Sequence, residues 1–378
     1  MDPIWIDNGA QLETFCRDID DGPVAVDTES DHFHAYQARV CLIQLADGKR
    51  EALIDPLALE ESELAPLFEL LEDPEIVKIL HSARNDIIEI DRDYGVCIAN
   101  LFDTQIAARF LAYERNSLTW MLEELLGVET GAEFKRFDWT TRPIPAEARR
   151  YAVDDVRYLA SLRERFLAEL EQQQWLEPFR QHCDYVIRSV EYESKEFDPG
   201  RWRKIKGSAK LDGRGRAALV ALFLWRHRLC TELNRSAVTL FPNGALFRLA
   251  KERPSTADGV AAMSGLPRQL AADYAEEIAA VIAQSKDADP PPKRAPKKSY
   301  RSSPPEQKAR YNALRQWRNE KANTLAIPSE FIATNATLSQ IAAEPPQNAE
   351  ELAEFGAILS WHVDTMGDEM LRILSNHA

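Results

Sequence analysis

The feature that most constrains this chain is a short apolar run ending in two closely spaced acids, Val24-Ala25-Val26-Asp27-Thr28-Glu29. In an extended strand, side chains two residues apart point to the same face, so Asp27 and Glu29 project together. Two neighbouring carboxylates in a low-dielectric setting repel each other unless a cation lies between them or one acid is protonated. A lone pair of this kind can also mark the solvated end of a strand, so its meaning depends on the rest of the chain.

Length and composition predict a soluble protein of two or three domains. The chain has 378 residues, which is too long for one ordinary core. Its five cysteines are scattered without the close spacing of a zinc site, and they favour reduced thiols. The longest apolar run, 217–225, is too short to cross a membrane, and the first residues lack a secretion signal. We therefore expect a cytoplasmic location.

The order of elements predicts an α/β fold for the first half. Strand-like runs lie at 3–6, 24–28, 39–46, 51–55, 76–80 and 101–102, and helical patterns at 7–18, 60–72, 83–90, 103–111, 118–126 and 146–174. Ser82 is expected to cap the third of these helices. We interpret residues 1–190 as a mixed sheet of about five strands with interleaved helices.

Three further residues stand where they could join the acid pair. Asp86 follows a strand-to-helix passage, where a side chain can reach over the carboxyl ends of neighbouring strands. Tyr151 and Asp155 are four residues apart in an expected helix and share one face. Each has an ordinary alternative, as a helix-start acid, a half-buried aromatic or a partner for a nearby arginine. The ordered set is more specific than its parts.

The successive patterns D-x-E, H-x-A-x-x-D and Y-x-x-x-D resemble the three motifs of the DEDD exonuclease superfamily, tyrosine subgroup. The surrounding sequence resembles the ribonuclease D family. Matching stretches cover the whole first half, at 26–29, 40–45, 53–57, 80–86, 102–107 and 151–159. The resemblance implies an RNase H-like fold and 3′-5′ exonuclease activity.

The resemblance also implies a metal site. By the family pattern, two divalent cations are held by four acids, Asp27, Glu29, Asp86 and Asp155, and Tyr151 orients the attacking water. Oxygen ligands without His or Cys suit Mg²⁺ or Mn²⁺ rather than zinc. A pair of such ions can neutralise charge on both the attacking and the leaving oxygen of a phosphodiester.

Other residues near these motifs have weaker claims. The family spacing selects Asp155 over its neighbour Asp154, which we expect to be structural. His81 is expected to pack near the site, and Asp103 to cap a helix. A loop resembling the R-x-D-W segment of the family carries three basic residues that could contact a phosphate, Lys135, Arg136 and Arg142.

The second half contains a repeat at an offset of 92 residues. Leu222, Trp225 and Arg226 match Leu314, Trp317 and Arg318. The match continues without a gap through Leu246, Leu249, Ala250 and Pro254, against Leu338, Ile341, Ala342 and Pro346. Two copies of one helical domain are therefore expected at 205–285 and 302–376, joined by a basic, Pro-rich linker at 286–301. Each copy resembles an HRDC domain, with Trp225 and Trp317 as core anchors.

The distribution of charge favours nucleic acid as a partner despite a net charge of −15. Residues 201–216 hold seven Lys or Arg and one acid, and such basic segments bind phosphates. A solubilising role is the commoner meaning of a charge run. We expect RNA contacts on the first HRDC copy, at Arg203, Lys204, Lys206 and Arg214.

The leading hypothesis is a 3′-5′ exoribonuclease that trims structured RNA such as tRNA precursors and releases nucleoside 5′-monophosphates. We expect neither a membrane nor an obligate protein partner. Four acids and a tyrosine specify only metal-assisted phosphodiester cleavage, and the direction, product and substrate are implied by the resemblance. The alternatives are a DNA 3′-5′ exonuclease and a catalytically silent RNA-binding scaffold.

Overall fold

The computed structural model describes residues 2–20, 22–129, 131, 134, 136–190, 192, 197–292 and 303–377. The chain forms two compact units. The first comprises Met1–Glu29, Val40–Tyr192 and Ser302–Ala378, and the second comprises Ser30–Arg39 and Glu193–Arg301. Within the described ranges, no helix is both long enough and apolar enough for a membrane crossing.

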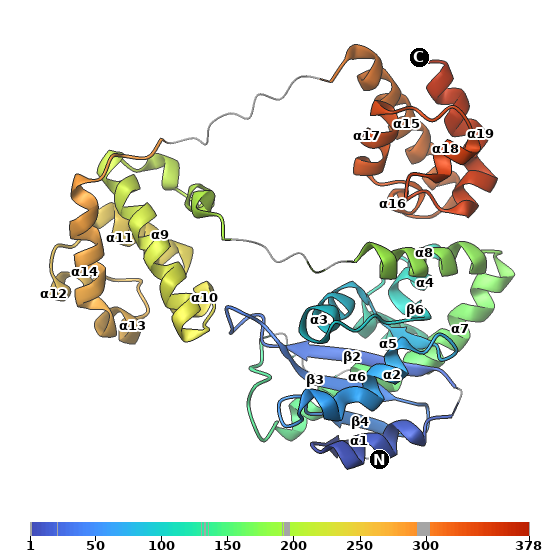
Figure 1. Cartoon of the computed structure of the whole chain (residues 1–378), viewed down its shortest axis with the longest axis horizontal. Helices are drawn as coiled ribbons and strands as arrows, with labels where there is room; N and C mark the ends of the chain where they lie inside the picture. The colour runs from blue at the N-terminus through green and yellow to red at the C-terminus, as the bar shows by residue number, and fades with distance from the viewer. Residues whose placement is uncertain are drawn as a thin grey trace. The chain divides into compact units, whose positions relative to one another are not determined.

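The first unit is built on a mixed sheet of six strands, with helices on its flanks (Figure 1). Their order across the sheet is β1 (Ile4–Ile6), β4 (Glu51–Ile54), β3 (Val40–Ala46), β2 (Val24–Ser30), β5 (Lys78–Leu80) and β6 (Leu101–Asp103). β3 runs antiparallel to β4, whereas β2, β5 and β6 are parallel. The predicted mixed sheet is confirmed, with six strands where about five were expected. The parallel trio brings three carboxyl ends to one edge of the sheet.

The helices of this part match most of the predicted segments. They are α1 (Gly9–Arg17), α2 (Ala65–Glu72), α3 (Arg84–Tyr94), α4 (Thr104–Phe110), α5 (Leu118–Leu126), α6 (Ala146–Arg157), α7 (Leu159–Gln172) and α8 (Leu176–Ser189). The single helix expected over 146–174 is wrong, because the chain breaks at Tyr158 into α6 and α7. α6 packs on β3 and β4, whereas α7 packs on α4 and β5. The break lets each helix follow a different surface.

The start of α3 is organised by Asp103 rather than by Ser82. Ser82 has a left-handed backbone with φ of 63°, and the cap position is Ala83, so the predicted Ser82 cap is wrong. The Asp103 carboxylate accepts the backbone N–H groups of Ser82 (3.1 Å) and Ala83 (2.8 Å). It also caps α4 through the N–H of Gln105 at 2.8 Å, as predicted. One buried acid thus fixes the starts of two helices.

Each HRDC copy is a small bundle of helices. The first contains α9 (Gly213–Leu233), α10 (Ala237–Leu240), α11 (Asn243–Glu252), α12 (Ala257–Ala261), α13 (Arg268–Asp273) and α14 (Ala275–Gln284). The second contains α15 (Pro305–Leu325), α16 (Ser329–Ile332), α17 (Asn335–Ala343), α18 (Ala349–Ala353) and α19 (Ser360–Ser375). Trp225 is 1% exposed, as expected for a core anchor. Trp317 is only half-buried, and its indole donates to Glu369 at 2.7 Å.

The arginine of each repeat holds its bundle together in the same way. Arg226 is buried and donates to the carbonyl of Phe241 and to Oδ1 of Asn243. In the second copy, Arg318 donates to the carbonyl of Ala333 and to Oδ1 of Asn335, both at 2.9 Å. All three positions keep the offset of 92 residues. A buried guanidinium needs its donors satisfied, so this pairing explains the arginine that follows each tryptophan.

The second HRDC copy belongs to the same compact unit as the sheet. The centroid of the Phe331 ring lies 4.6 Å from that of the Phe110 ring in α4 and 4.4 Å from that of the His182 ring in α8. Arg109 forms an ion pair with Glu330. The backbone N–H of Trp361 donates to Gln181 at 3.1 Å. An aromatic contact surface therefore joins two segments far apart in the chain.

A buried histidine, His362, and a half-buried one, His182, lie in this contact surface. His362 accepts the N–H of Leu359 at Nδ1 (2.8 Å), so its proton is on Nε2, which donates to the Phe331 carbonyl (2.7 Å). Burial lowers the pKa of His362 to about 4. Burial, with the nearby His362 and Arg109, also lowers the pKa of His182 to about 4. Both rings are therefore neutral in the folded protein at neutral pH.

Acid is expected to destabilise this contact surface. Histidine in an unfolded chain has a pKa near 6.5, so the stabilisation is complete above about pH 6.5 and is lost as pH falls toward about 4. By about pH 5 the free energy of unfolding should fall by roughly 1–2 kcal/mol per histidine. His182→Phe retains an aromatic ring at this position but cannot take up a proton. Urea unfolding of this variant should therefore show a smaller loss of unfolding free energy between about pH 7 and 5. The control is His377→Phe, at an exposed position. An unchanged pH dependence in His182→Phe would contradict the assignment.

Candidate active site

Three of the predicted acids converge at the carboxyl end of β2. Asp27 and Glu29 project from that strand, and Asp155 comes from α6. One carboxylate oxygen from each lies within 4.8 Å of the others. Residues that sequence places more than a hundred positions apart thus share one small volume.

Asp86, at the first turn of α3, is the fourth predicted acid and is 8% exposed. Its Oδ1 accepts two hydrogen bonds from Thr28, from the backbone N–H at 3.1 Å and from the hydroxyl at 2.6 Å. Its charge raises the pKa of Asp27 and Glu29, so it lies beside the trio. Thr28 therefore orients Asp86, a role that the sequence pattern did not indicate.

Tyr151 lies one helical turn from Asp155, as its spacing predicts. The side chains of these two residues are hydrogen-bonded, and the phenol is the donor when the carboxylate is ionised. The Tyr151 ring stacks on Trp139, with centroids 6.4 Å apart and an interplanar angle of 29°. Trp139 is 2% exposed, and its side chain is hydrogen-bonded to Glu29. The loop tryptophan therefore supports both an acid of the cluster and the tyrosine.

The acids are electrostatically costly without a cation. Burial is the largest cause that raises the pKa of each acid in the cluster. Burial raises the pKa of Glu29 to about 9, and the charges of Asp155 and Asp86 add to the shift. The pKa of Asp86 and that of Asp155 each rise to about 7. Asp27, next to three other carboxylates, has a pKa raised well above its usual value.

This cluster fits a divalent cation of the hard type. Its members offer only carboxylate oxygens, the ligands that Mg²⁺ and Mn²⁺ prefer. A bound cation would remove the repulsion that keeps these acids protonated. Glu89, in α3, adds one more negative charge that raises the pKa of both Glu29 and Asp86. The sequence patterns did not single out Glu89, because its position matches none of the three motifs.

Two other residues near the site have structural roles. His81 is half-buried, and its Nδ1 lies 3.0 Å from the Thr104 hydroxyl. Burial lowers its pKa. Asp154 pairs with Arg157 at 3.1 Å, one position from Asp155 but outside the acid cluster. The ion pair of Asp154 agrees with the structural role expected of it, and the contact of His81 with Thr104 is that of a packed residue.

Of the three phosphate contacts predicted in the loop, the structure contradicts one. Arg142 uses all its donors, with Asp55 as a bidentate partner and the carbonyls of Cys41, Trp139 and Thr141 as further acceptors. We correct its interpretation to a structural one. Arg136 is exposed, and Lys135 lies outside the described residues.

The basic residues predicted in the second unit differ in exposure. Arg203 is half-buried, with its guanidinium 4.7 Å from the Trp202 ring centroid. The other three are exposed, Lys204, Lys206 and Arg214.

Comparison with known proteins agrees with this geometry. Residues 3–171 match the 3′-5′ exonuclease family, and residues 216–282 and 307–374 match the HRDC domain. Ribonuclease D of Pseudomonas paraeruginosa is 29% identical over 378 residues, which cover 98% of this chain and 97% of that protein. The chain therefore carries a 3′-5′ exonuclease domain followed by two HRDC domains, and it is similar to a ribonuclease D over nearly its whole length.

Two further relatives show how widely this architecture is shared. Protein RRP6-like 2 of Arabidopsis thaliana is 29% identical over 272 residues, 69% of this chain but only 31% of that protein. The chain thus spans about a third of the length of such RRP6-like relatives. The crystal structure of Escherichia coli RNase D has a TM-score of 0.63 at 24% identity, with 100% of this chain and 99% of that chain covered. The folds of the sheet domain and of both HRDC copies are therefore similar to those of the E. coli protein.

Adjacent acids in α6 allow a matched test of the site. Asp155→Asn should lower the rate of phosphodiester hydrolysis by roughly a hundredfold or more, because it removes one of three clustered oxygen ligands. Asp154→Asn removes the same charge one residue away and should change the rate by less than about threefold. Both rates are measured on the same labelled oligonucleotide with saturating Mg²⁺. Equal losses in the two variants would show that net charge, and not the cluster, matters.

Proposed function

We propose that this chain is a metal-dependent exoribonuclease that removes nucleoside 5′-monophosphates one at a time from the 3′ ends of structured RNA. The observation that carries the proposal is the convergence of Asp27, Glu29 and Asp155 within 4.8 Å, with Asp86 beside them. The five free cysteines agree with a cytoplasmic setting, which is also part of the proposal.

Asp27, Glu29 and Asp155 would hold one divalent cation, and Asp27 with Asp86 would face a second. When bound, such a pair supplies positive charge to both the attacking and the leaving oxygen of the phosphodiester. Mg²⁺ and Mn²⁺ both suit these ligands. The first turn of α3 and the end of β2 set the spacing of these acids before any ion arrives.

The neighbouring side chains keep this site in order. Tyr151, hydrogen-bonded to Asp155, is in place to orient a water for attack. Trp139 restrains Glu29, and Thr28 restrains Asp86. Restrained ligands lose less freedom when substrate binds, which is how a positioned site lowers the barrier.

The charge of the site favours a strict dependence on metal. Without cations, the ionised acids of the cluster repel a phosphodiester and the protonated ones offer it no positive charge, so the 3′ end of a nucleic acid is bound productively only when cations are present. Chelation should therefore abolish hydrolysis.

RNA is the proposed substrate because of the relatives and the basic second unit. The E. coli relative is described as an exoribonuclease involved in structured RNA processing. Two HRDC domains follow the catalytic half in sequence, and residues 201–216 carry seven Lys or Arg. These observations support tRNA precursors as a substrate class, with the basic segment holding the folded body of the RNA.

A time course on RNA labelled at its 5′ end tests the proposal. With Mg²⁺, the product ladder should shorten from the 3′ end, and EDTA should stop it. A tRNA precursor with a 3′ extension should be shortened to its mature end, while a matched DNA strand is cut more slowly. RNA that is bound but uncut with either Mg²⁺ or Mn²⁺ would favour a binding scaffold. Equal rates on the DNA strand would point to an exonuclease without preference for RNA.

A further inference from the structure

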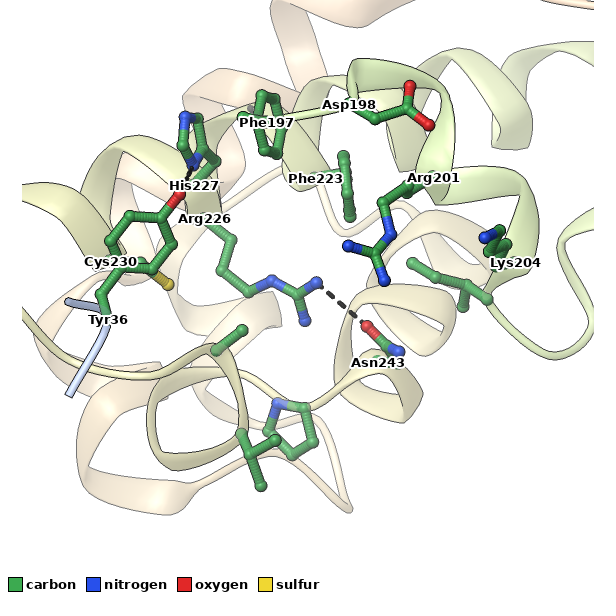
Figure 2. A pocket seen from close by; sticks show the side chains of 14 residues that line it. Tyr36, Phe197, Asp198, Arg201, Lys204, Phe223, Arg226, His227, Cys230 and Asn243 are labelled. Carbon is green, nitrogen blue, oxygen red and sulfur yellow. Dashed lines mark hydrogen bonds between the residues drawn. The ribbon is translucent and has the colours of Figure 1, made fainter. Parts of the chain in front are cut away.

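The second unit contains a cavity of about 380 Å³ that holds none of the catalytic acids (Figure 2). It lies among the short turn Pro199–Lys204, the middle of α9 and the starts of α10 and α11, with Tyr36 at one side. All these segments belong to the same compact unit. The volume is within the range of pockets that bind small ligands.

The lining carries an excess of positive charge. The lining includes three cationic side chains, Arg201, Lys204 and Arg226, and one acid, Asp198. The Asp198 carboxylate already accepts the backbone N–H of Gly200 at 2.7 Å. Among the described residues, no carboxylate forms an ion pair with any of the three cations. Figure 2 shows the guanidinium groups of Arg201 and Arg226 toward the middle of the pocket. An anion there would meet positive charge with little competition.

Arg226 forms the floor of the cavity and is only 5% exposed. Its hydrogen-bond partners are a backbone carbonyl and an amide oxygen, both neutral. A buried cation with only neutral partners is costly. Burial accordingly lowers the pKa of the Arg226 guanidinium, and a bound anion would offset that cost.

Flat aromatic rings form another side of the pocket. The Phe197 ring stacks on His227, with centroids 3.5 Å apart and planes within 2°. The plane of the Phe223 ring is tilted by 22° from that of Phe197, and the two ring centroids are 5.5 Å apart. The Tyr36 hydroxyl lies 2.9 Å from Nδ1 of His227. Layered rings beside cationic groups are the surroundings in which nucleobases stack and phosphates bind.

The second HRDC copy keeps the scaffold of this region but not the pocket lining. At the offset of 92 residues, Arg318 and Asn335 repeat the Arg226 and Asn243 pair. Phe223 and His227, however, correspond to Arg315 and Asn319. Val238, 60% exposed at the pocket of the first copy, corresponds to Glu330, which pairs with Arg109. The aromatic part of the lining is therefore a property of the first copy and not of the HRDC fold, whereas the buried arginine is common to both copies.

We propose that this cavity binds one nucleotide, its base against the rings of Phe197, His227 and Tyr36 and its phosphate near Arg201 and Lys204. The nucleotide comes either from an unpaired position of an RNA chain or from free nucleoside monophosphate in solution. The first source rests on the RNA substrate proposed above, and the second does not. Either way, this is a second nucleotide site, built from residues other than the catalytic acids.

Binding measurements on the full chain in EDTA test this site without any hydrolysis. Without metal the catalytic acids repel phosphate, so bound nucleotide reports the cavity. The probes are adenosine 5′-monophosphate, ribose 5-phosphate and a short labelled single-stranded RNA. The pocket variant is Arg201→Glu with Lys204→Glu, both exposed positions. The matched control is Arg228→Glu with Lys251→Glu, also exposed and outside the lining.

The pocket variant should weaken binding of adenosine 5′-monophosphate by about tenfold or more, and the control by less than about twofold. Ribose 5-phosphate should bind about tenfold more weakly than the nucleotide, because it lacks the base. Val238→Trp, which narrows the mouth without altering charge, should also weaken nucleotide binding. If RNA binding falls in the pocket variant beyond the control, the ligand is a nucleotide within a chain. If only monophosphate binding falls, the ligand is the free nucleotide.

Three results would overturn the proposal. Equal losses in the pocket and control variants would mean nonspecific attraction by charge. Equal affinity for ribose 5-phosphate and adenosine 5′-monophosphate would show that the base does not contribute to binding. Absence of saturable binding of both the nucleotide and the RNA would remove the site itself. Because no cleavage is measured, none of these results depends on whether the chain hydrolyses RNA.

Discussion

Asp27→Asn is expected to abolish hydrolysis and at the same time to stabilise the metal-free protein. Asp27 lies between Glu29, Asp86 and Asp155, and burial with these three charges raises its pKa well above its usual value. The neutral amide has nearly the same shape, so the repulsion disappears with little loss of packing. Hydrolysis should fall by roughly a thousandfold or more, because the acid shared by both ion positions is lost.

The stability gain separates this result from simple misfolding. In EDTA at about pH 8, the midpoint of thermal unfolding should rise by about 2–4 °C in Asp27→Asn. Added Mg²⁺ should raise the midpoint of the unmodified chain but leave that of the variant nearly unchanged. Glu171→Gln, at an exposed position of α7, is the control and should behave like the unmodified chain. A destabilised, inactive Asp27→Asn would mean that this acid supports the fold.

Raising the pH is expected to destabilise the metal-free protein, and Mg²⁺ is expected to reverse the effect. An acid in an unfolded chain has a pKa near 4, whereas burial and Asp155 raise the pKa of Glu29 to about 9. Between these values the folded state binds more protons than the unfolded state, so the free energy of unfolding falls as pH rises. Each such proton contributes about 1.4 kcal/mol per pH unit.

The window from about pH 7 to 9 excludes the histidines of the contact surface, which titrate below it, and reports the acids of the cluster. Urea unfolding in EDTA should show the loss of stability, and Glu29→Gln should make that loss smaller. Calorimetric titration with Mg²⁺ in two buffers of different ionisation enthalpy should show protons released on binding. A metal-free protein whose stability does not change across this window would contradict the raised pKa of Glu29.

The parts of the site that sequence could predict are those set by local periodicity. Side chains two residues apart in a strand lie on one face, and this periodicity placed Asp27 with Glu29. Side chains four residues apart in a helix also lie on one face, and this periodicity placed Tyr151 with Asp155. The order of motifs then supplied Asp86, and the parallel strands brought these pieces to one edge.

The supporting contacts were not predictable, because they join segments by tertiary packing. Thr28 reaches Asp86 across 58 residues, and Trp139 reaches Glu29 from a loop. Arg142 looked like a phosphate contact, yet Asp55 and three carbonyls use all its donors. The break at Tyr158 depends on which surface α7 covers, and residue periodicity carries no information about that choice.

The contact between the second HRDC copy and the sheet domain bears on how the protein is synthesised. Phe110 and His182 complete their surroundings only against Phe331 and Trp361, which are made about 150 residues or more after them. A nascent chain that has already formed its sheet must therefore hold an unfinished aromatic surface until the helices of the second HRDC copy emerge from the ribosome. A stop codon in the second HRDC copy would release all the catalytic residues together with that uncovered surface. Such fragments should depend on chaperones and aggregate more readily than the whole chain.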